Sequence, residues 1–270
     1  MSNAFVKHAS GPDDNLPGEA AGLTWLRDAQ ADGGAPVVDV LRVGGGELVL
    51  NRLSPGPPSP EAATRFGRAL AHTHASGAPW WGCPPPEWPG PMWQGSSHSP
   101  MASRDEAPAT FGEFYARYRV EPFVRRLFDE GAIDSGSRRA FDVLLGRLTA
   151  GELDHDQPAL VTKNGHAVAR LHGDLWTGNA FWAQREGGTE VVLIDPMAYG
   201  GHAETDLATL SVFGFDHLSE VYAGYQEASP LADGWRERLD LHRLAIVVLH
   251  AAVFGGSYVP KAARLASAYR

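Results

Sequence analysis

Two polar motifs lie on either side of the strongest strand signal in this 270-residue chain. The first reads His172-Gly173-Asp174-Leu175-Trp176-Thr177-Gly178-Asn179. The second begins at Asp195, directly after Val191-Val192-Leu193-Ile194, an apolar, β-branched run typical of a buried strand. Carboxylate and amide oxygens are the ligands that Mg²⁺ prefers in proteins. Asp174, Asn179 and Asp195 are therefore candidates for one cation-dependent site.

The order and spacing of these residues match a pattern that supports phosphoryl transfer. In protein kinases the catalytic loop reads H-R-D-L-x-x-x-N, and a later aspartate binds magnesium. Every position agrees here except the arginine, which is replaced by Gly173. We expect Asp174 to orient and deprotonate an acceptor hydroxyl. We expect Asn179 and Asp195 to hold Mg²⁺ against the phosphates of ATP.

A short run near the N-terminus fits a second part of the same pattern. Residues 4–7, Ala-Phe-Val-Lys, resemble the strand whose lysine contacts the nucleotide phosphates. Glu19 opens a helix predicted over residues 19–27. In kinases a glutamate on this helix pairs with the lysine and holds it toward the nucleotide. We therefore expect Lys7 and Glu19 to form an ion pair.

Two further strands are predicted at residues 37–41 and 47–50, joined by three consecutive glycines. The second strand leads into the segment where a kinase hinge offers backbone groups to adenine. Leu50, Asn51 and Leu53 are expected to bind the nucleotide there. Four prolines within residues 54–60 mark a boundary. The prediction is a nucleotide-binding lobe over residues 1–53 and a catalytic and substrate lobe over residues 54–270.

The rest of the chain is predicted to be mainly helical. Residues 79–108 are crowded with Pro, Gly, Ser and Trp and show no period, which predicts a long functional or mobile loop. Helical spacing begins at Pro60 and returns at residues 111–128, 137–148, 205–213, 217–226 and 235–254. A few strands followed by many helices indicate the α+β class.

Composition limits the possible partners. Lys and Arg number 23 against 32 Asp and Glu, a formal charge of −9. Such a chain lacks the positive field that nucleic acids and anionic membranes require. The single cysteine excludes an internal disulfide and a Cys-rich zinc site. No apolar run reaches the roughly 18 residues of a membrane span. We expect a cytoplasmic protein that binds neither nucleic acid nor membrane.

Together the motifs resemble those of the fructosamine/ketosamine-3-kinase family, within the aminoglycoside-phosphotransferase-like, protein-kinase-like superfamily. The resemblance extends from about Phe5 to the C-terminus. It rests on the catalytic loop with its internal Trp176, on Asp195-Pro196-Met197-Ala198-Tyr199-Gly200-Gly201 and on Glu204-Thr205-Asp206-Leu207-Ala208. It implies a two-lobed protein-kinase-like fold. It also implies ATP- and Mg²⁺-dependent phosphorylation of a sugar hydroxyl of a ketosamine, a fructosamine or ribulosamine that is free or protein-bound.

The resemblance also implies roles for individual residues. Asp174 is the base, Asn179 and Asp195 are metal ligands, and Lys7 with Glu19 anchors the phosphates. We expect the substrate to contact His172, Trp176 and Tyr199.

The chain departs from the family pattern at its N-terminus. Family members have a β-hairpin before the lysine strand, and its loop covers the ATP phosphates. Only six residues precede Lys7 in this sequence. We expect the first hairpin to be missing, which predicts weak ATP binding. Two alternatives stay open: a kinase for another small hydroxyl substrate such as an aminoglycoside, and a weakly active pseudokinase that acts as a binding module.

Several other residues have a structural interpretation beside a functional one. Asp206 is expected to brace the catalytic loop rather than to bind metal. His242 and His250 are expected to be packing or surface residues. Four tryptophans of the long loop either line a sugar- or amine-binding surface or anchor the loop on the core: Trp80, Trp81, Trp88 and Trp93.

Overall fold

The chain folds into short antiparallel strands and a larger set of helices. The computed structural model describes residues 4–9, 15–86, 88–94 and 97–269. Its helices are α1 (Leu16–Asp28), η1 (Ala29–Asp32), α2 (Pro60–Ala75), α3 (Phe111–Phe114), η2 (Tyr115–Val120), α4 (Glu121–Asp129), α5 (Ser135–Thr149), α6 (Ala159–Lys163), α7 (Glu204–Leu210), α8 (Leu218–Ala228), α9 (Trp235–Phe254) and α10 (Tyr258–Ser267). Its strands are β1 (Ala4–His8), β2 (Val40–Gly44), β3 (Glu47–Asn51), β4 (Met92–Gln94), β5 (Ser97–Ser99), β6 (Ala169–Leu171), β7 (Ala180–Arg185), β8 (Gly188–Leu193) and β9 (Tyr199–Gly201).

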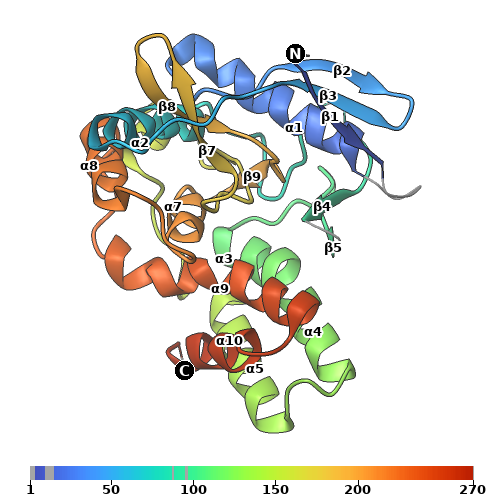
Figure 1. Cartoon of the computed structure of the whole chain (residues 1–270). Coiled ribbons are helices and arrows are strands. Elements are labelled where there is room, and N and C mark those ends of the chain that lie inside the picture. The colour runs from blue at the N-terminus through green and yellow to red at the C-terminus, as the bar shows by residue number, and fades with distance from the viewer. Residues whose placement is uncertain (1–3, 10–14, 87, 95–96, 270) are drawn as a thin grey trace.

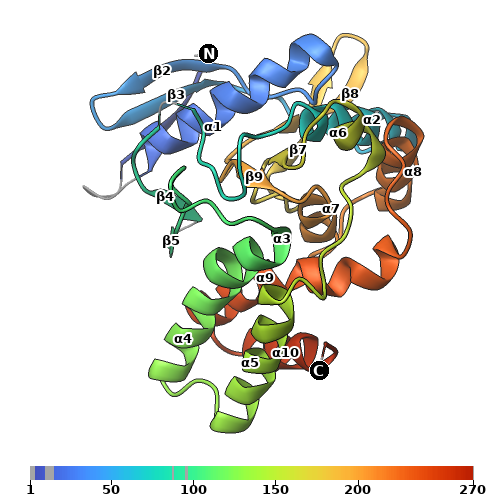
Figure 2. The same cartoon turned by 180° about the vertical axis from the view of Figure 1, so that it is seen from behind.

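The N-terminal sheet lies at one end of the molecule and a group of helices lies at the other (Figure 1). The sheet of β1, β2 and β3 lies beside α1 at one end, and α4, α5 and α10 lie at the other (Figure 2). The strands and turns around β7, β9 and α7 lie between them. Both polar motifs belong to this middle part, because the first precedes β7 and the second follows β8.

The N-terminal sheet has the strand order β1-β3-β2 and is antiparallel throughout. The predicted hairpin is confirmed, since β2 and β3 pair directly across the glycine turn. Gly44, Gly45 and Gly46 have φ angles of +136°, +62° and +76°. Residues with a Cβ rarely adopt such angles, so the turn requires glycine.

The strand predicted over residues 37–41 begins later, at Val40. Val37 forms an isolated parallel bridge to Leu193 of β8. The N–H of Leu193 donates to the Pro36 carbonyl (2.8 Å), and the N–H of Val38 donates to the Leu193 carbonyl (3.1 Å). The valine run was correctly predicted to be extended. However, its first residues bond to the middle of the molecule instead of to the N-terminal sheet.

The described residues of the segment 79–108 include several that pack on the core, and β4 and β5 pair there in antiparallel orientation. Trp80 donates its Nε1–H to the Ala102 carbonyl (2.9 Å). Trp81 stacks on Phe114, with 6.3 Å between ring centroids. These contacts favour the anchoring interpretation for Trp80 and Trp81. The helix predicted over residues 111–128 is continuous through α3, a π-helical segment η2 and α4.

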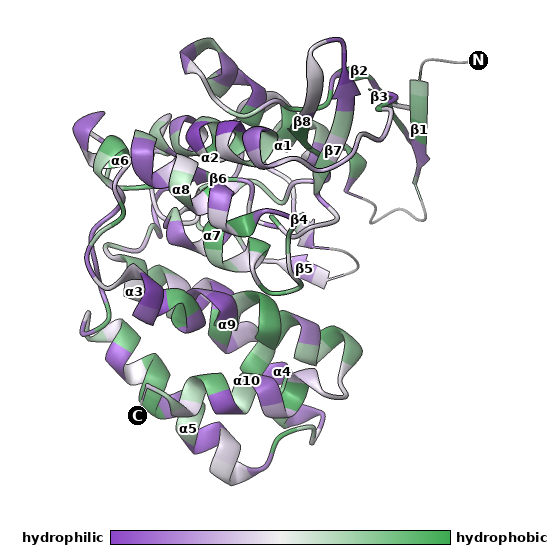
Figure 3. Cartoon of the chain, turned by 60° about the vertical axis from the view of Figure 1, so that its left-hand side comes forward, coloured by the Kyte–Doolittle hydropathy of each residue, from purple (hydrophilic) through white to green (hydrophobic). Residues whose placement is uncertain are grey.

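The described residues form two apolar cores. One joins α3, α4, α5, α9 and α10, and the other joins α1, the N-terminal sheet, α2, α8 and the hairpin β7–β8. Hydrophobic and hydrophilic residues alternate along α4 (Figure 3), which is typical of helices with one buried face. The second half of α9 is buried on several faces. No described helix is both long and apolar enough to cross a membrane.

Candidate active site

The catalytic-loop motif forms a tight turn between β6 and β7, and Gly173 makes this turn possible. Gly173 has a φ of +80°. A Cβ at this position would lie 2.0 Å from the Met197 carbonyl oxygen and 2.7 Å from the Tyr199 ring. The arginine of the protein-kinase pattern therefore cannot fit in this turn.

Asp174 accepts hydrogen bonds on both carboxylate oxygens. Gln94 Nε2 donates to Oδ1 (2.6 Å), and Asn179 Nδ2 donates to Oδ2 (3.0 Å). Burial raises the pKa of Asp174 to about 6, and the two hydrogen bonds partly oppose that rise. The carboxylate is therefore largely ionised at neutral pH and remains basic enough to take a proton.

Asn179 and Asp195 meet beside Asp174. Asn179 Nδ2 also donates to the backbone carbonyls of Asp174 (2.9 Å) and Asp195 (3.3 Å). This leaves the amide oxygen of Asn179 as its possible ligand atom. Asp195 has a φ of +51°, a left-handed conformation that Asp tolerates better than most residues. Its carboxylate is 41% exposed and is thus accessible to a cation.

Lys7 connects the N-terminal sheet to this centre. Its Nζ lies 2.9 Å from each carboxylate oxygen of Glu19 and 2.5 Å from Asp195 Oδ1. The predicted pairing of Lys7 with Glu19 is confirmed. Burial alone would lower the pKa of Lys7, but Glu19 and Asp195 together raise it. Burial raises the pKa of Glu19 to about 7 although Lys7 opposes the rise.

Asp206 braces the turn from behind, as the sequence predicted. Its Oδ2 accepts the backbone N–H of His172 (2.8 Å), and its Oδ1 accepts that of Gly173 (3.0 Å). His74 Nε2 lies 3.2 Å from Oδ2 and is fully buried. All these contacts are made within the protein, so Asp206 positions the loop.

The three residues expected to contact substrate occupy different environments. His172 is fully buried, with Nε2 bonded to the Ile194 carbonyl (2.8 Å) and Nδ1 facing the N–H of Asp174 (3.3 Å). This position corrects the expected substrate contact, because the ring has no access to solvent. Trp176 is 38% exposed and accessible to a ligand. Tyr199 is buried and lines a small cavity next to Gly173.

The expected hinge residues lie at and beyond the end of β3. The Leu50 side chain is buried in the core, and the Asn51 N–H donates to the Asp39 carbonyl (2.9 Å). Asn51 Nδ2 also bonds to Asp39 Oδ2 (2.9 Å). The Asn51 N–H is thus already engaged within the protein. Contacts from Leu50, Asn51 and Leu53 to adenine stay a prediction.

Sequence reasoning missed Gln94, which bonds to Asp174, and Arg119, which lies against Tyr199. Gln94 lies on β4, within a segment without period or motif. Arg119 is buried below Tyr199, with its guanidinium carbon 4.0 Å from the ring centroid. Arg119 and Gln94 line the same cavity as Tyr199 and Gly173. Only the three-dimensional fold brings these positions together, so no local signal could have identified them.

Comparison with known proteins decides the family. The model of the fructosamine kinase family matches residues 3–269. The chain belongs to this family. Ketosamine-3-kinase from Mus musculus is 32% identical over 146 residues, which are 54% of this chain and 42% of the mouse protein. In the first three curated relatives, the matched segments span 40%, 30% and 42% of the relative's length.

Solved structures support the same relationship. A candidate fructosamine-3-kinase from Thermobifida fusca is 35% identical with a TM-score of 0.83, and the match covers 98% of this chain and 85% of that chain. ADP-bound aminoglycoside phosphotransferase APH(2'')-Ib is 12% identical with a TM-score of 0.60, covering 98% of this chain and 88% of that chain. The second likeness shows the fold alone. The predicted α+β, protein-kinase-like fold is confirmed, whereas the lobe boundary at residues 53 and 54 stays a prediction.

Proposed function

We propose that this fructosamine kinase family member transfers a phosphoryl group from ATP to a sugar hydroxyl of a ketosamine. The observation that carries the proposal is the convergence of Asp174, Asn179 and Asp195, which flank the hairpin β7–β8, with Lys7 from the N-terminal sheet. Family membership supports ketosamines as acceptors, and the mouse relative is named ketosamine-3-kinase. The acceptor class is a fructosamine or ribulosamine, free or attached to a protein lysine.

Each side chain has a role in this proposal. Asp174 accepts a hydrogen bond from the acceptor hydroxyl and takes its proton, as a carboxylate with a pKa of about 6 can do near neutral pH. Lys7 holds the nucleotide phosphates, and Glu19 holds Lys7. Leu50, Asn51 and Leu53 border the adenine, within a nucleotide-binding lobe of residues 1–53. Trp176, which is exposed, lies on the acceptor side, and Tyr199 borders that side from the small cavity next to Gly173.

The donor set fits magnesium. The carboxylate of Asp195 and the amide oxygen of Asn179 are hard oxygen ligands, and Asp195 is accessible. These two residues would hold Mg²⁺, which neutralises negative charge on the transferring phosphoryl group. The protein orients the ligands through the hydrogen bonds from Asn179 and the left-handed backbone at Asp195.

An assay of synthetic fructoselysine with ATP and Mg²⁺ tests the proposal. Asp174→Asn should lower turnover by about 10²–10⁴-fold, because the base is lost while the shape is kept. Asp216→Asn is the matched control, since Asp216 is an exposed aspartate outside the site. Turnover of the Asp174 variant close to that of the control would overturn the assignment. Turnover of an aminoglycoside but not of fructoselysine would favour the alternative acceptor class. Binding without turnover of any acceptor would favour a pseudokinase.

A further inference from the structure

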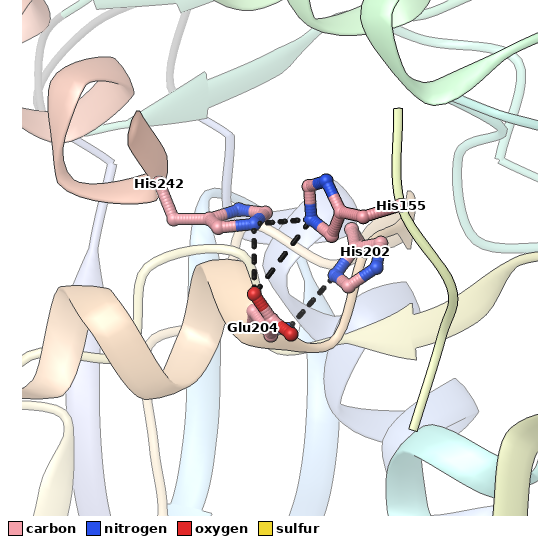
Figure 4. Close-up of side chains that lie close together, drawn as sticks. All are labelled: His155, His202, Glu204 and His242. Atoms are coloured by element: carbon pink, nitrogen blue, oxygen red, sulfur yellow. Dashed lines mark hydrogen bonds and ion pairs between the residues drawn. The ribbon is translucent and has the colours of Figure 1, made fainter. Parts of the chain in front are cut away.

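A second cluster of polar side chains lies outside the phosphoryl-transfer site. His155 comes from the segment between α5 and α6, His202 follows β9, Glu204 opens α7, and His242 lies on α9. The four side chains point toward one another (Figure 4). One ligand atom from each lies within 4.8 Å of all the others. None of these side chains is more than 8% exposed.

The outer nitrogen of each imidazole is bonded to an oxygen. His155 Nδ1 donates to the Leu153 carbonyl (2.8 Å), and His202 Nε2 donates to the Asp156 carbonyl (3.1 Å). His242 Nδ1 lies 2.9 Å from Thr205 Oγ1. Because carbonyls only accept, His155 and His202 carry their proton on the outer nitrogen and direct a lone pair into the cluster. Metal-binding histidines are typically oriented by such outer hydrogen bonds.

The nitrogen and oxygen atoms that face the centre of the cluster carry too few protons to form hydrogen bonds with all of their neighbours. His155 Nε2 and His242 Nε2 are 2.9 Å apart. Glu204 Oε2 lies 3.4 Å from His242 Nε2 and 3.7 Å from His155 Nε2. A proton on His242 Nε2 can form a well-directed hydrogen bond to His155 Nε2 or to Glu204 Oε2, but not to both. The remaining inner nitrogen, His202 Nδ1, accepts a 3.2 Å hydrogen bond from the Glu204 N–H.

The hydrogen bonds that His155 and His202 donate from their outer nitrogens leave the inner nitrogen of each ring without a proton. The neutral imidazole is the form that binds metals. A divalent cation among the four atoms would satisfy His155 Nε2, His242 Nε2 and the Glu204 carboxylate at the same time, and at His202 Nδ1 it would replace the hydrogen bond from the Glu204 N–H.

We propose that His155, His202, Glu204 and His242 form a binding site for a divalent transition-metal ion, with zinc as the preferred ion. Three nitrogens and one carboxylate oxygen suit tetrahedral Zn²⁺, whereas Mg²⁺ prefers oxygen ligands throughout. Four protein ligands in a buried place leave no open coordination position. The site is therefore structural rather than catalytic.

The surroundings support a stabilising role for this ion. Arg238 Nη2 bonds to Glu204 Oε1 (2.7 Å), and Arg238 Nε bonds to Oε2 (3.1 Å). These bonds orient the carboxylate and leave further lone pairs on each oxygen. Glu204 precedes Asp206, the brace of the catalytic loop, by two residues on α7. An ion at Glu204 would thus fix the start of the helix that positions this loop.

Metal titration of the full chain without an affinity tag tests the proposal. The protein is stripped with a chelator and titrated with Co²⁺ and then Zn²⁺, without nucleotide or Mg²⁺. We expect the visible absorption of four-coordinate cobalt, its displacement by one equivalent of zinc, and a higher melting temperature with zinc. Absence of cobalt absorption together with an unchanged melting temperature would overturn the site. The cluster would then be a hydrogen-bond network around the Arg238–Glu204 pair.

Matched histidine variants locate the bound metal. His155→Gln and His242→Gln should each lower zinc affinity by 10-fold or more, because each removes one ligand. His250→Gln is the control, since His250 lies on the same helix as His242 but outside the cluster. Equal zinc affinity in His155→Gln and wild type would place the metal elsewhere and overturn the proposal. The wild-type cobalt spectrum decides the outcome even if a variant fails to fold.

Discussion

Asp174 has to meet two opposing requirements at the scale of a single residue. A general base must be ionised near pH 7, but burial favours its neutral form. Gln94 and Asn179 donate to its two oxygens and so stabilise the ionised form. Burial still prevails and raises the pKa of Asp174 to about 6. The base is therefore stronger than an exposed aspartate and is still charged at neutral pH.

The pH dependence of turnover follows from this balance. Only ionised Asp174 can take a proton, so its ionisation should make kcat/KM fall about tenfold per pH unit below about pH 6. Gln94→Leu removes a hydrogen bond that lowers this pKa, so the acidic limb should move to higher pH. Gln184→Leu, at an exposed position of the hairpin β7–β8, should leave the limb in place. An identical profile for all three proteins would contradict the role of Gln94.

Asp195 should contribute to nucleotide binding only through the cation. Asp195→Asn removes one ligand charge, and Asn tolerates the left-handed backbone at this position. We expect the Mg²⁺-dependent part of ATP affinity to fall by at least 10-fold, while adenosine affinity changes little. Calorimetric titrations with and without Mg²⁺ separate the two contributions. A parallel loss of adenosine binding would mean that Asp195 is structural.

At the scale of elements, α2 and α8 depend on two glycines for their close contact. A Cβ on Gly67 of α2 would lie 2.0 Å from the Val221 carbonyl oxygen of α8. A Cβ on Gly224 of α8 would lie 2.1 Å from the Thr64 carbonyl oxygen of α2. Each helix thus packs directly against the backbone of the other. Glycine lowers the helix propensity by about 1 kcal/mol relative to alanine. The close contact between the two helices offsets this loss.

Gly67→Ala should therefore destabilise the protein although alanine favours helices. Overpacking against backbone typically costs about 1–3 kcal/mol, which exceeds the gain in propensity. Gly146→Ala on α5 is the matched control, because its Cβ would meet no atom within 4 Å. The control should gain about 0.5–1 kcal/mol. Urea denaturation measures both, and equal midpoints for the two variants would contradict the close packing of α2 on α8.

The sequence predicted those parts of the molecule whose signals are local. Helical spacing and the valine run located most elements, and the loop motif with Asp195 located the candidate site. Lys7 and Glu19 were paired correctly because the strand–helix order of the family fixes their relation. His172 was misjudged, because the motif gives its position in the chain but not its burial.

The remaining features depend on contacts between distant segments. Gln94 reaches Asp174 across 80 residues, and His155 reaches His242 across 87. Neither segment has a period or spacing that points to its partner. Val37 belongs to a run typical of a sheet strand but pairs with β8. Tertiary packing, and not the strand propensity of the valine run, determines which strand Val37 pairs with.

At the scale of the whole molecule, we expect copies of the chain to associate through the edge strand β1. Within the described residues, residues 5–8 of β1 have a neighbouring strand, β3, on one side only, because the strand order is β1-β3-β2. Its apolar side chains Phe5 and Val6 are 45% and 39% exposed. An exposed apolar edge is a template for pairing with another chain. The wild type should therefore show a light-scattering mass that rises with concentration.

A lysine on this edge should prevent the association, because charged edge residues disfavour strand pairing. Val6→Lys should thus keep the monomer mass at concentrations where the wild type associates. Val143→Lys is the matched control, since Val143 is 48% exposed on α5, which lies at the other end of the molecule (Figure 1). This control should associate as the wild type does. A wild type that stays monomeric at every concentration, or equal masses for the two variants, would show that β1 does not mediate contacts between chains.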